Sequence, residues 1–218
     1  MFKIKGELII KKLQLAIDLF DLKSSLKLLK KVADYFEIIE LGTPLIISEG
    51  LSIIPVIKEL YPEKIVFADL KVMDGGGIIP DLAFQKGADM VSVLAAANNS
   101  TIKASIKSAA EFKKEILIDM CSVSKIKKRA EEIDRFSPAY ISVHRAADMK
   151  MEEIDPLKNI KFLKNIKAKK AVAGGINLNN FEKACKSSAD IIIVGGAVYK
   201  NEKPEYVAEK MRKIIDNY

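Results

Sequence analysis

The feature that most constrains the fold is a regular alternation between short apolar runs and segments with helical spacing. Eight apolar runs have the length and composition of buried strands, and amphipathic segments separate them. Near-continuous apolar strands are typical of a parallel sheet that helices cover. Eight units in 218 residues leave about 27 residues each, close to the minimum for a strand–helix–strand unit. We therefore predict a closed (β/α)8 TIM barrel of the α/β class, with an open doubly wound sheet as the alternative.

The predicted elements run through the chain without a linker or a low-complexity stretch. The predicted strands are 13–19, 36–42, 64–72, 90–96, 115–122, 139–146, 170–176 and 190–198. The predicted helices are 22–35, 50–60, 100–112, 126–136, 179–188 and 204–216. We expect a single catalytic barrel domain over residues 13–218, preceded by an N-terminal extension over residues 1–12.

Composition and charge limit the class of protein. The net charge of +7 is spread over many helical segments with acidic residues among the lysines, so we expect no nucleic-acid partner. No apolar run approaches the ~20 residues that a membrane helix needs, and the N-terminal apolar patch is too short for a signal peptide. Cys121 and Cys185 lack a metal-binding spacing. We therefore expect free thiols, a cytoplasmic location and no membrane partner.

Charged residues follow the predicted strands at the point where each strand ends. In a barrel the carboxyl ends of all strands meet at one rim, where the active sites of this fold are built. Residues that are far apart in the chain would therefore converge on one pocket. These residues are Asp18, Glu40, Asp69, Lys71, Asp119, His144 and Arg145.

The stretch ADLKVMDGG, residues 68–76, places charges in and just after an apolar strand. Charged side chains are rarely buried unless they are paired or bound to a ligand. Asp69 and Lys71 are two residues apart and should point the same way, into the top of the barrel. Asp74 follows in a glycine-rich turn. A buried structural ion pair is the alternative, but such pairs often cost about as much as they return, which favours a functional role.

Paired glycines end the last two predicted strands. Loops after strands 7 and 8 of a barrel often bind phosphate, because glycine lets backbone N–H groups approach the anion closely. We expect a phosphate site at Gly174, Gly175, Gly195 and Gly196, with Asn177 or Asn179 as the cap of the next helix. His144 is the only histidine of the chain, and its position after a strand leaves a functional and a structural role equally open.

These motifs together resemble a known family. The pattern D-x-K-x-x-D at residues 69–74 is the signature of the orotidine 5′-phosphate decarboxylase superfamily of barrels. The stretches LQLAIDL, IIELGTPLIISEG, ILIDM, ISVH, AVAGGI and IIIVGGAV look like its branch of 3-hexulose-6-phosphate synthases and 3-keto-L-gulonate-6-phosphate decarboxylases. The similarity runs from about residue 13 to the C-terminus.

The resemblance implies a metal-dependent enzyme. It implies that Glu40 and Asp69 hold a Mg²⁺ ion, which binds substrate oxygens and stabilises a 1,2-enediolate intermediate. It further implies that Asp18 lies beside the substrate and that Lys71 supports the intermediate. Mg²⁺ prefers oxygen ligands, and a cation beside developing negative charge lowers its energy.

The resemblance also implies a homodimer and a sugar-phosphate substrate. It places Asp74 across the dimer interface and gives His144 a role in proton transfer. Asp119 and Arg145 are candidates for contacts with the substrate. The paired glycines match the phosphate-binding loops of the family.

Two reactions share the implied intermediate. A synthase takes a proton from ribulose 5-phosphate and adds the enediolate to formaldehyde, whereas a decarboxylase reaches an enediolate by losing CO₂. Ala173, Gly196 and Asp119 resemble the synthase, since the decarboxylase typically has threonine, arginine and glutamate there. HRAAD, residues 144–148, is closer to the decarboxylase, and the loop over 148–157 differs from both. We expect the synthase, with the decarboxylase or a non-catalytic sugar-phosphate-binding barrel as alternatives.

Overall fold

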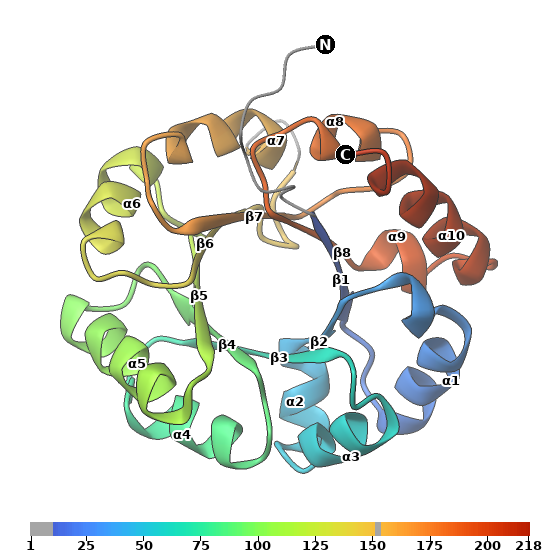
Figure 1. Cartoon of the computed structure of the whole chain (residues 1–218), viewed down its shortest axis with the longest axis horizontal. Helices are drawn as coiled ribbons and strands as arrows, with labels where there is room; N and C mark the ends of the chain where they lie inside the picture. Colours follow the sequence, from blue (N-terminus) through green and yellow to red (C-terminus); the bar gives the residue numbers. More distant parts are fainter. Residues whose placement is uncertain (1–10, 151–153) are drawn as a thin grey trace.

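The computed structural model of the chain describes residues 11–150 and 154–218, and Figure 1 shows a ring of strands inside a ring of helices. The strands pair in parallel, in chain order, and β8 pairs with β1 to close the barrel. The predicted (β/α)8 barrel is confirmed, and the open doubly wound sheet is excluded. The predicted extension, residues 1–12, falls mostly outside the described residues, although Lys12 already belongs to the first strand.

The eight strands lie where the apolar runs predict them, although β1 and β7 begin one residue earlier than predicted and every strand except β3 ends earlier than predicted. They are β1 (Lys12–Ile17), β2 (Ile38–Leu41), β3 (Ile65–Val72), β4 (Met90–Leu94), β5 (Glu115–Asp119), β6 (Tyr140–His144), β7 (Lys169–Ala173) and β8 (Ile191–Val194).

The helices include several that the sequence spacing does not predict. They are α1 (Leu22–Val32), α2 (Thr43–Glu49), α3 (Ile53–Leu60), α4 (Ile78–Gln85), α5 (Asn99–Phe112), α6 (Ile126–Asp134), α7 (Pro156–Asn159), α8 (Phe181–Cys185), α9 (Gly196–Tyr199) and α10 (Pro204–Ile215). Short 3₁₀ helices, η1 (Ala33–Tyr35) and η2 (Ile160–Leu163), follow α1 and α7. The helices α2, α4 and α7 lie in segments where the sequence predicts neither a helix nor a strand, whereas α9 replaces the end of the predicted strand 190–198. The atypical loop over 148–157 contains residues 151–153, which lie outside the described residues.

Two apolar layers hold the barrel together. The larger layer lies between the strands and the surrounding helices. The smaller one fills the inside of the barrel with buried side chains from β2 to β8, which are Ile38, Phe67, Met90, Leu117, Tyr140, Ala171, Ala173, Ile191 and Ile193. Side chains along a strand alternate between faces, so the residue two positions further on also points inward, one level closer to the rim. This inner apolar layer forms the floor of the barrel mouth.

Strand β3 departs from regular pairing near its end. Ala68 pairs with Val91 and Val72 pairs with Val93, so the residues between them form a bulge against β4. Lys71 has a φ of 45°, which is uncommon for a residue other than glycine. Its N–H donates a hydrogen bond of 2.8 Å to the hydroxyl of Ser92 on β4, which holds the bulge in place. The bulge directs the end of β3 toward the mouth.

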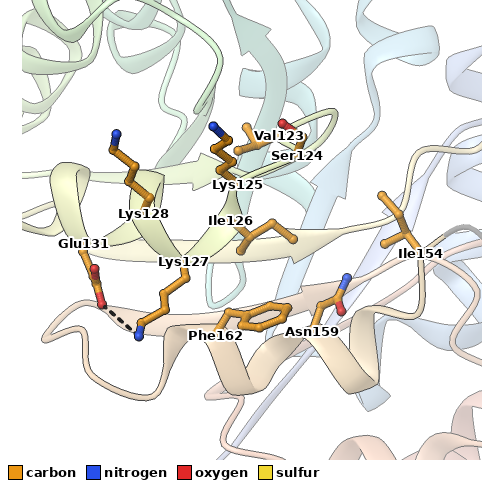
Figure 2. Close-up of a pocket in the computed structure, with 10 residues that line it drawn as sticks. All are labelled: Val123, Ser124, Lys125, Ile126, Lys127, Lys128, Glu131, Ile154, Asn159 and Phe162. Carbon is orange, nitrogen blue, oxygen red and sulfur yellow. Dashed lines mark ion pairs between the residues drawn. The ribbon is translucent and has the colours of Figure 1, made fainter.

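A cavity of about 660 Å³ lies outside the mouth, between α6 and the α7–η2 segment (Figure 2). Its wall combines apolar side chains such as Ile126 and Phe162 with three lysines. The carboxylate of Glu131 is paired with Lys127 at 4.0 Å. Because it lacks the converging carboxylates of the mouth, this cavity is not the candidate active site.

No helix in the described part of the chain is long and apolar enough to cross a lipid bilayer.

Candidate active site

A ring of polar side chains lies directly above the apolar floor of the barrel. Five successive strands, β2 to β6, each contribute a buried polar residue two positions after a floor residue. These are Glu40, Asp69, Ser92, Asp119 and Ser142. Burying this many polar groups is costly unless they are hydrogen-bonded or bound to a ligand. The ring is therefore the candidate active site.

Glu40 is held on one side of the mouth by Gln14 of β1. Its carboxylate accepts a hydrogen bond of 2.7 Å from the Gln14 side-chain amide, and both residues are buried. Burial raises the pKa of Glu40 well above its ordinary value, and the nearby charge of Asp69 acts in the same direction. The Oε1 atom of Gln14 is buried without a hydrogen-bond partner among the described residues.

The carboxylate of Asp69 has three partners in the mouth. Its Oδ1 accepts from the Ser92 hydroxyl at 2.7 Å, and its Oδ2 accepts from the Thr43 hydroxyl at 3.0 Å. The Lys71 ammonium forms an ion pair with the same Oδ2. Burial alone would lower the pKa of Lys71, but the charges of Asp69 and Asp119 outweigh it and raise that pKa. Lys71 therefore carries a positive charge in the mouth.

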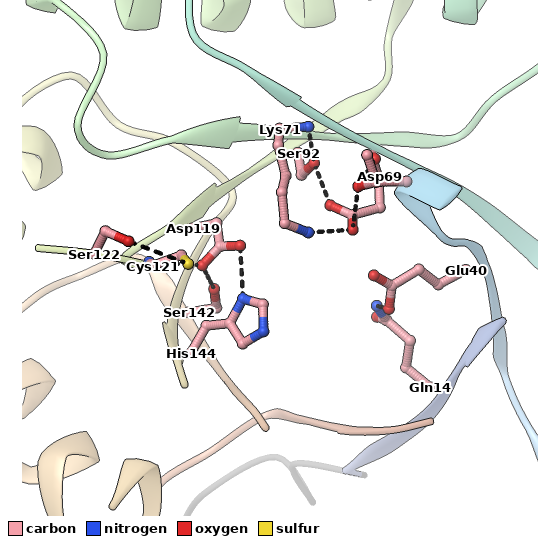
Figure 3. A network of polar contacts seen from close by, with 11 residues as sticks. Gln14, Glu40, Asp69, Lys71, Ser92, Asp119, Cys121, Ser122, Ser142 and His144 are labelled. Carbon is pink, nitrogen blue, oxygen red and sulfur yellow. Dashed lines mark hydrogen bonds and ion pairs between the residues drawn. The ribbon is translucent and has the colours of Figure 1, made fainter. Parts of the chain in front are cut away.

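Asp119 and His144 form a second pair on the opposite side of the mouth (Figure 3). The Nδ1 of His144 lies 2.8 Å from Asp119 Oδ2, and Asp119 Oδ1 accepts from the Cys121 N–H at 2.9 Å. Burial would lower the pKa of His144, but Asp119 outweighs it and raises that pKa. Burial would raise the pKa of Asp119, but His144 and Lys71 outweigh it and lower that pKa. With Nδ1 bonded to Asp119, Nε2 is the ring nitrogen that this pair leaves available.

Asp18 follows β1 at the rim and completes the acidic side of the mouth. Burial raises its pKa, and Asp69 acts in the same direction. A Cβ at Gly42 would lie only 2.2 Å from Asp18 Oδ1, so this carboxylate occupies space that only a glycine leaves open. The glycine after β2 thus determines where Asp18 can lie.

The paired glycines lie after the adjacent strands β7 and β8. Gly174 and Gly175 have φ values of 96° and 75°, which favour glycine. A Cβ at Gly174 would lie 2.5 Å from the Arg145 carbonyl oxygen. The predicted cap at Asn177 or Asn179 is wrong, because Asn180 precedes α8 and its side chain bonds to the loop instead.

Two predicted site residues, Arg145 and Asp74, do not contact the other charged residues of the mouth within the described part of one chain. Arg145 donates to the carbonyl oxygen of Met149 in its own loop. Asp74 is exposed, and its carboxylate accepts from the N–H of the adjacent Gly75 at 2.7 Å. The structure thus brings together Asp18, Glu40, Asp69, Lys71, Asp119 and His144.

Four uncharged residues that hold this network together were not predicted from the sequence, namely Gln14, Thr43, Ser92 and Ser142. Three of them lie inside apolar strands, where a single polar residue two positions after a large apolar one marks the inward face. That spacing is a usable signal for Ser92 and Ser142. Thr43 follows β2 and has no comparable signal.

Glu40 and Asp69 are the carboxylates available to a metal. Within the described ranges, no group of three or more histidine, cysteine, aspartate and glutamate residues is arranged to hold an ion. A pair of carboxylates still suits Mg²⁺, which is commonly held by one or two carboxylates with water and substrate completing its shell. The charge of Asp69 also raises the pKa of Glu40, as expected where two carboxylates face the same site.

The barrel and the charged residues at its mouth are typical of a class of enzymes with this fold. The chain matches the family model described as orotidine 5'-phosphate decarboxylase / HUMPS family over residues 11–211. It therefore belongs to this family and is an enzyme, and the carbon–carbon lyase class fits the names of its relatives.

Within this family the chain is similar to several 3-hexulose-6-phosphate synthases. It is 39% identical to the 3-hexulose-6-phosphate synthase of Bacillus subtilis (strain 168), over 93% of this chain and 98% of that protein. The crystal structure of the Salmonella typhimurium 3-hexulose-6-phosphate synthase has a TM-score of 0.91 at 35% identity, covering 94% and 99% of the two chains. The 3-keto-L-gulonate-6-phosphate decarboxylase of Vibrio cholerae has a TM-score of 0.84 at 27% identity, covering 95% and 98%.

Proposed function

We propose that this chain is a Mg²⁺-dependent aldehyde-lyase of the 3-hexulose-6-phosphate synthase type, which joins formaldehyde to ribulose 5-phosphate. The observation that carries this proposal is the division of the mouth into two sides. Glu40 and the Asp69–Lys71 ion pair lie opposite the Asp119–His144 pair. The side with Glu40, Asp69 and Lys71 suits an anionic intermediate, because it combines an ammonium group with two carboxylates that can hold a cation. The side with Asp119 and His144 suits proton transfer.

The residues at the mouth fit a divalent cation. Glu40 and Asp69 would hold it, because two close carboxylates in a buried site raise each other's energy unless a cation separates them. The buried Oε1 of Gln14, which has no partner among the described residues, adds a further oxygen donor beside Glu40. When bound, the ion would stabilise negative charge that develops on the substrate oxygens.

The side chains of the mouth then account for the bond changes. A proton leaves the C1 carbon of ribulose 5-phosphate, and the resulting enediolate attacks the carbonyl carbon of formaldehyde. The formaldehyde oxygen takes up a proton as the new carbon–carbon bond forms. The Lys71 ammonium stabilises the enediolate charge, and the Nε2 of His144 is the group placed to carry a proton.

The phosphate of the substrate would lie at the glycine loops after β7 and β8. The positive φ values of Gly174 and Gly175 support this role, since they bring backbone rather than side chains to the surface of the loop. The same enediolate would serve a 3-keto-L-gulonate-6-phosphate decarboxylase, which is the second candidate because a neighbour of that name shares the fold at 27% identity. A sugar-phosphate-binding barrel without turnover is the third.

Assays of the purified full chain separate these candidates. We expect formaldehyde to be consumed with ribulose 5-phosphate and Mg²⁺, and the rate to fall to background in EDTA. Release of CO₂ from 3-keto-L-gulonate 6-phosphate would favour the decarboxylase. Thermal stabilisation by sugar phosphates without any turnover would favour the binding protein.

A pair of matched variants tests the assigned metal site. Asp69→Asn should abolish metal-dependent activity and weaken Mn²⁺ binding measured by electron paramagnetic resonance. Asp89→Asn is the control, because Asp89 pairs with Lys58 and Lys114 before β4, at the other end of the barrel. Equal loss of metal binding in both variants would contradict the assignment.

We further propose a homodimer formed through the loops and helices that follow β1, β2 and β3. Large apolar side chains are exposed there, with Phe20 at 73%, Ile47 at 79% and Ile78 at 70% of their accessible surface. Apolar side chains gathered on neighbouring elements are typical of an interaction surface. Asp74 lies in the same region and would reach the mouth of the partner subunit.

We also propose a cytoplasmic location. Cys121 and Cys185 are both buried free thiols, which supports a reducing compartment.

A further inference from the structure

The side chain of Lys200 lies over the second glycine pair of the mouth. Lys200 follows α9 and is four residues after Gly196, and its N–H donates to the Gly196 carbonyl oxygen at 3.1 Å. A Cβ built on Gly196 would lie 3.5 Å from Cδ, 3.6 Å from Cε and 3.9 Å from Nζ of Lys200. The chain of Lys200 therefore runs back along α9 and places its ammonium group beside Gly196.

The surroundings of this ammonium belong to the rim of the mouth. A Cβ on the preceding Gly195 would lie 3.1 Å from the Ala16 carbonyl oxygen, two residues before Asp18. The charge of Lys200 is one of those that lower the pKa of Asp18, against the stronger effect of burial. The Nζ atom also lies 5.7 Å from the centre of the Tyr199 ring.

Lys200 lacks a close carboxylate of its own. Among the ion pairs within 4.0 Å in the described ranges 11–150 and 154–218, none includes Lys200. The rim thus presents a cation beside glycines that offer N–H groups and no charge.

We propose that Lys200 binds the phosphate group of the substrate and determines the affinity for phosphorylated sugars. This inference rests on the proposed function for the identity of the substrate. A phosphate monoester carries nearly two negative charges at neutral pH, and lysine binds phosphate as a mobile point charge. Because position 196 has no side chain, the Lys200 ammonium lies directly beside the loop backbone, where it and the loop N–H groups can reach the same oxygens. Lys200 does not touch the reacting carbons, so it acts on binding and not on the bond changes.

Lys210 provides a matched control. It lies on α10, its ammonium is 5.6 Å from the ring of Tyr206, and it is four residues after that tyrosine. Like Lys200→Met, the variant Lys210→Met removes one positive charge and one contact between an ammonium group and a tyrosine ring. Of these two lysines, only Lys200 lies beside a glycine pair of the mouth. A difference in KM or in phosphate binding between the two variants therefore reports on the phosphate site.

The test combines kinetics with a binding measurement that needs no turnover. Lys200→Met should raise the KM for ribulose 5-phosphate by about 10-fold to 100-fold, as expected for loss of a hydrogen bond to a charged group. The kcat and the KM for formaldehyde should stay within about twofold, since a phosphate contact acts equally on ground and transition states. Inorganic phosphate should stabilise the native protein against heat but not Lys200→Met, and Lys200→Arg should restore both effects.

The outcomes distinguish this inference from the proposed function. If Lys200→Met and Lys210→Met give the same KM and the same response to phosphate, the inference about Lys200 is wrong while the proposed function stands. If the native chain binds phosphate through Lys200 but turns over neither substrate, the inference stands and the proposed activity is wrong. If the native chain binds neither inorganic phosphate nor ribulose 5-phosphate, both are wrong.

Discussion

Replacing Asp119 by asparagine gives the sharpest test of the proton-transfer side of the mouth. The substitution preserves size and shape but removes the charge that lies 2.8 Å from Nδ1 of His144. The asparagine oxygen can still accept from the Cys121 N–H, which lies 2.9 Å from Asp119 Oδ1. With the oxygen bonded to Cys121, the amide NH2 takes the place of Oδ2 and faces Nδ1 of His144, so Asp119→Asn removes both the charge and the hydrogen-bond acceptor beside the imidazole. We expect the pKa of His144 to fall, because burial then acts on it without the opposing carboxylate.

The size of the effect follows from the hydrogen bond and its pH dependence. A hydrogen bond to a charged group contributes about 1.5–3 kcal/mol, and one between neutral groups about 0.5–1.5 kcal/mol. Because folding raises the pKa of His144, the charged bond contributes fully below the ordinary histidine pKa of about 6.5. That contribution is lost as the pH rises through the raised pKa. Folding lowers the pKa of Asp119, so its own contribution is lost only as the pH falls through that lowered value.

The loss of unfolding free energy in Asp119→Asn should thus be about 1.5–3 kcal/mol at pH 5.5 and smaller at pH 9. Urea unfolding at both pH values measures it. His144 is the only histidine of the chain, so one NMR signal of the untagged protein reports its titration directly. Asp89→Asn should destabilise the protein without moving that signal. An unchanged pKa of His144, or an equal loss at both pH values, would refute the reasoning.

Three further substitutions test other parts of the structure. Gly174→Ala should lower the free energy of unfolding by about 1–3 kcal/mol in urea, since its φ is 96° and the new methyl would approach the Arg145 carbonyl oxygen. Ser92→Ala should cost about 1–3 kcal/mol by leaving Asp69 without one buried hydrogen bond, and native-like stability would contradict this. Ile78→Lys should convert the proposed dimer to single chains in sedimentation experiments, whereas an unchanged mass would speak against the interface.

The strand pattern was sufficient to predict the barrel and most of the mouth. Buried parallel strands are apolar along their whole length, so a charged residue at a strand end, such as Glu40 or Asp119, is conspicuous. Closure of the barrel then brings these ends together whatever their separation in sequence. This geometric rule explains why the convergence of Asp69, Lys71 and His144 could be predicted without knowledge of any contact.

Other features depend on interactions that the local pattern does not record. The bulge at Lys71 is held by the Ser92 hydroxyl from the next strand. The helix α4 begins directly after three glycines, in a segment whose composition suggests a turn. Gln14 reaches Glu40 only because β1 and β2 pair side by side in the barrel. Each of these depends on a tertiary contact.

The apolar floor of the barrel restricts the route by which reactants enter and leave the mouth. Phe67, Met90, Leu117 and Tyr140 close the cylinder from below with buried side chains. A molecule that reaches Lys71 must therefore arrive and depart from the same side. If two reactants bind in a pocket that is open at one end only, the reactant that binds deeper must bind first. It can dissociate unreacted only after the other reactant has left. An inhibitor that binds across the rim would prevent a ligand bound deeper in the mouth from dissociating.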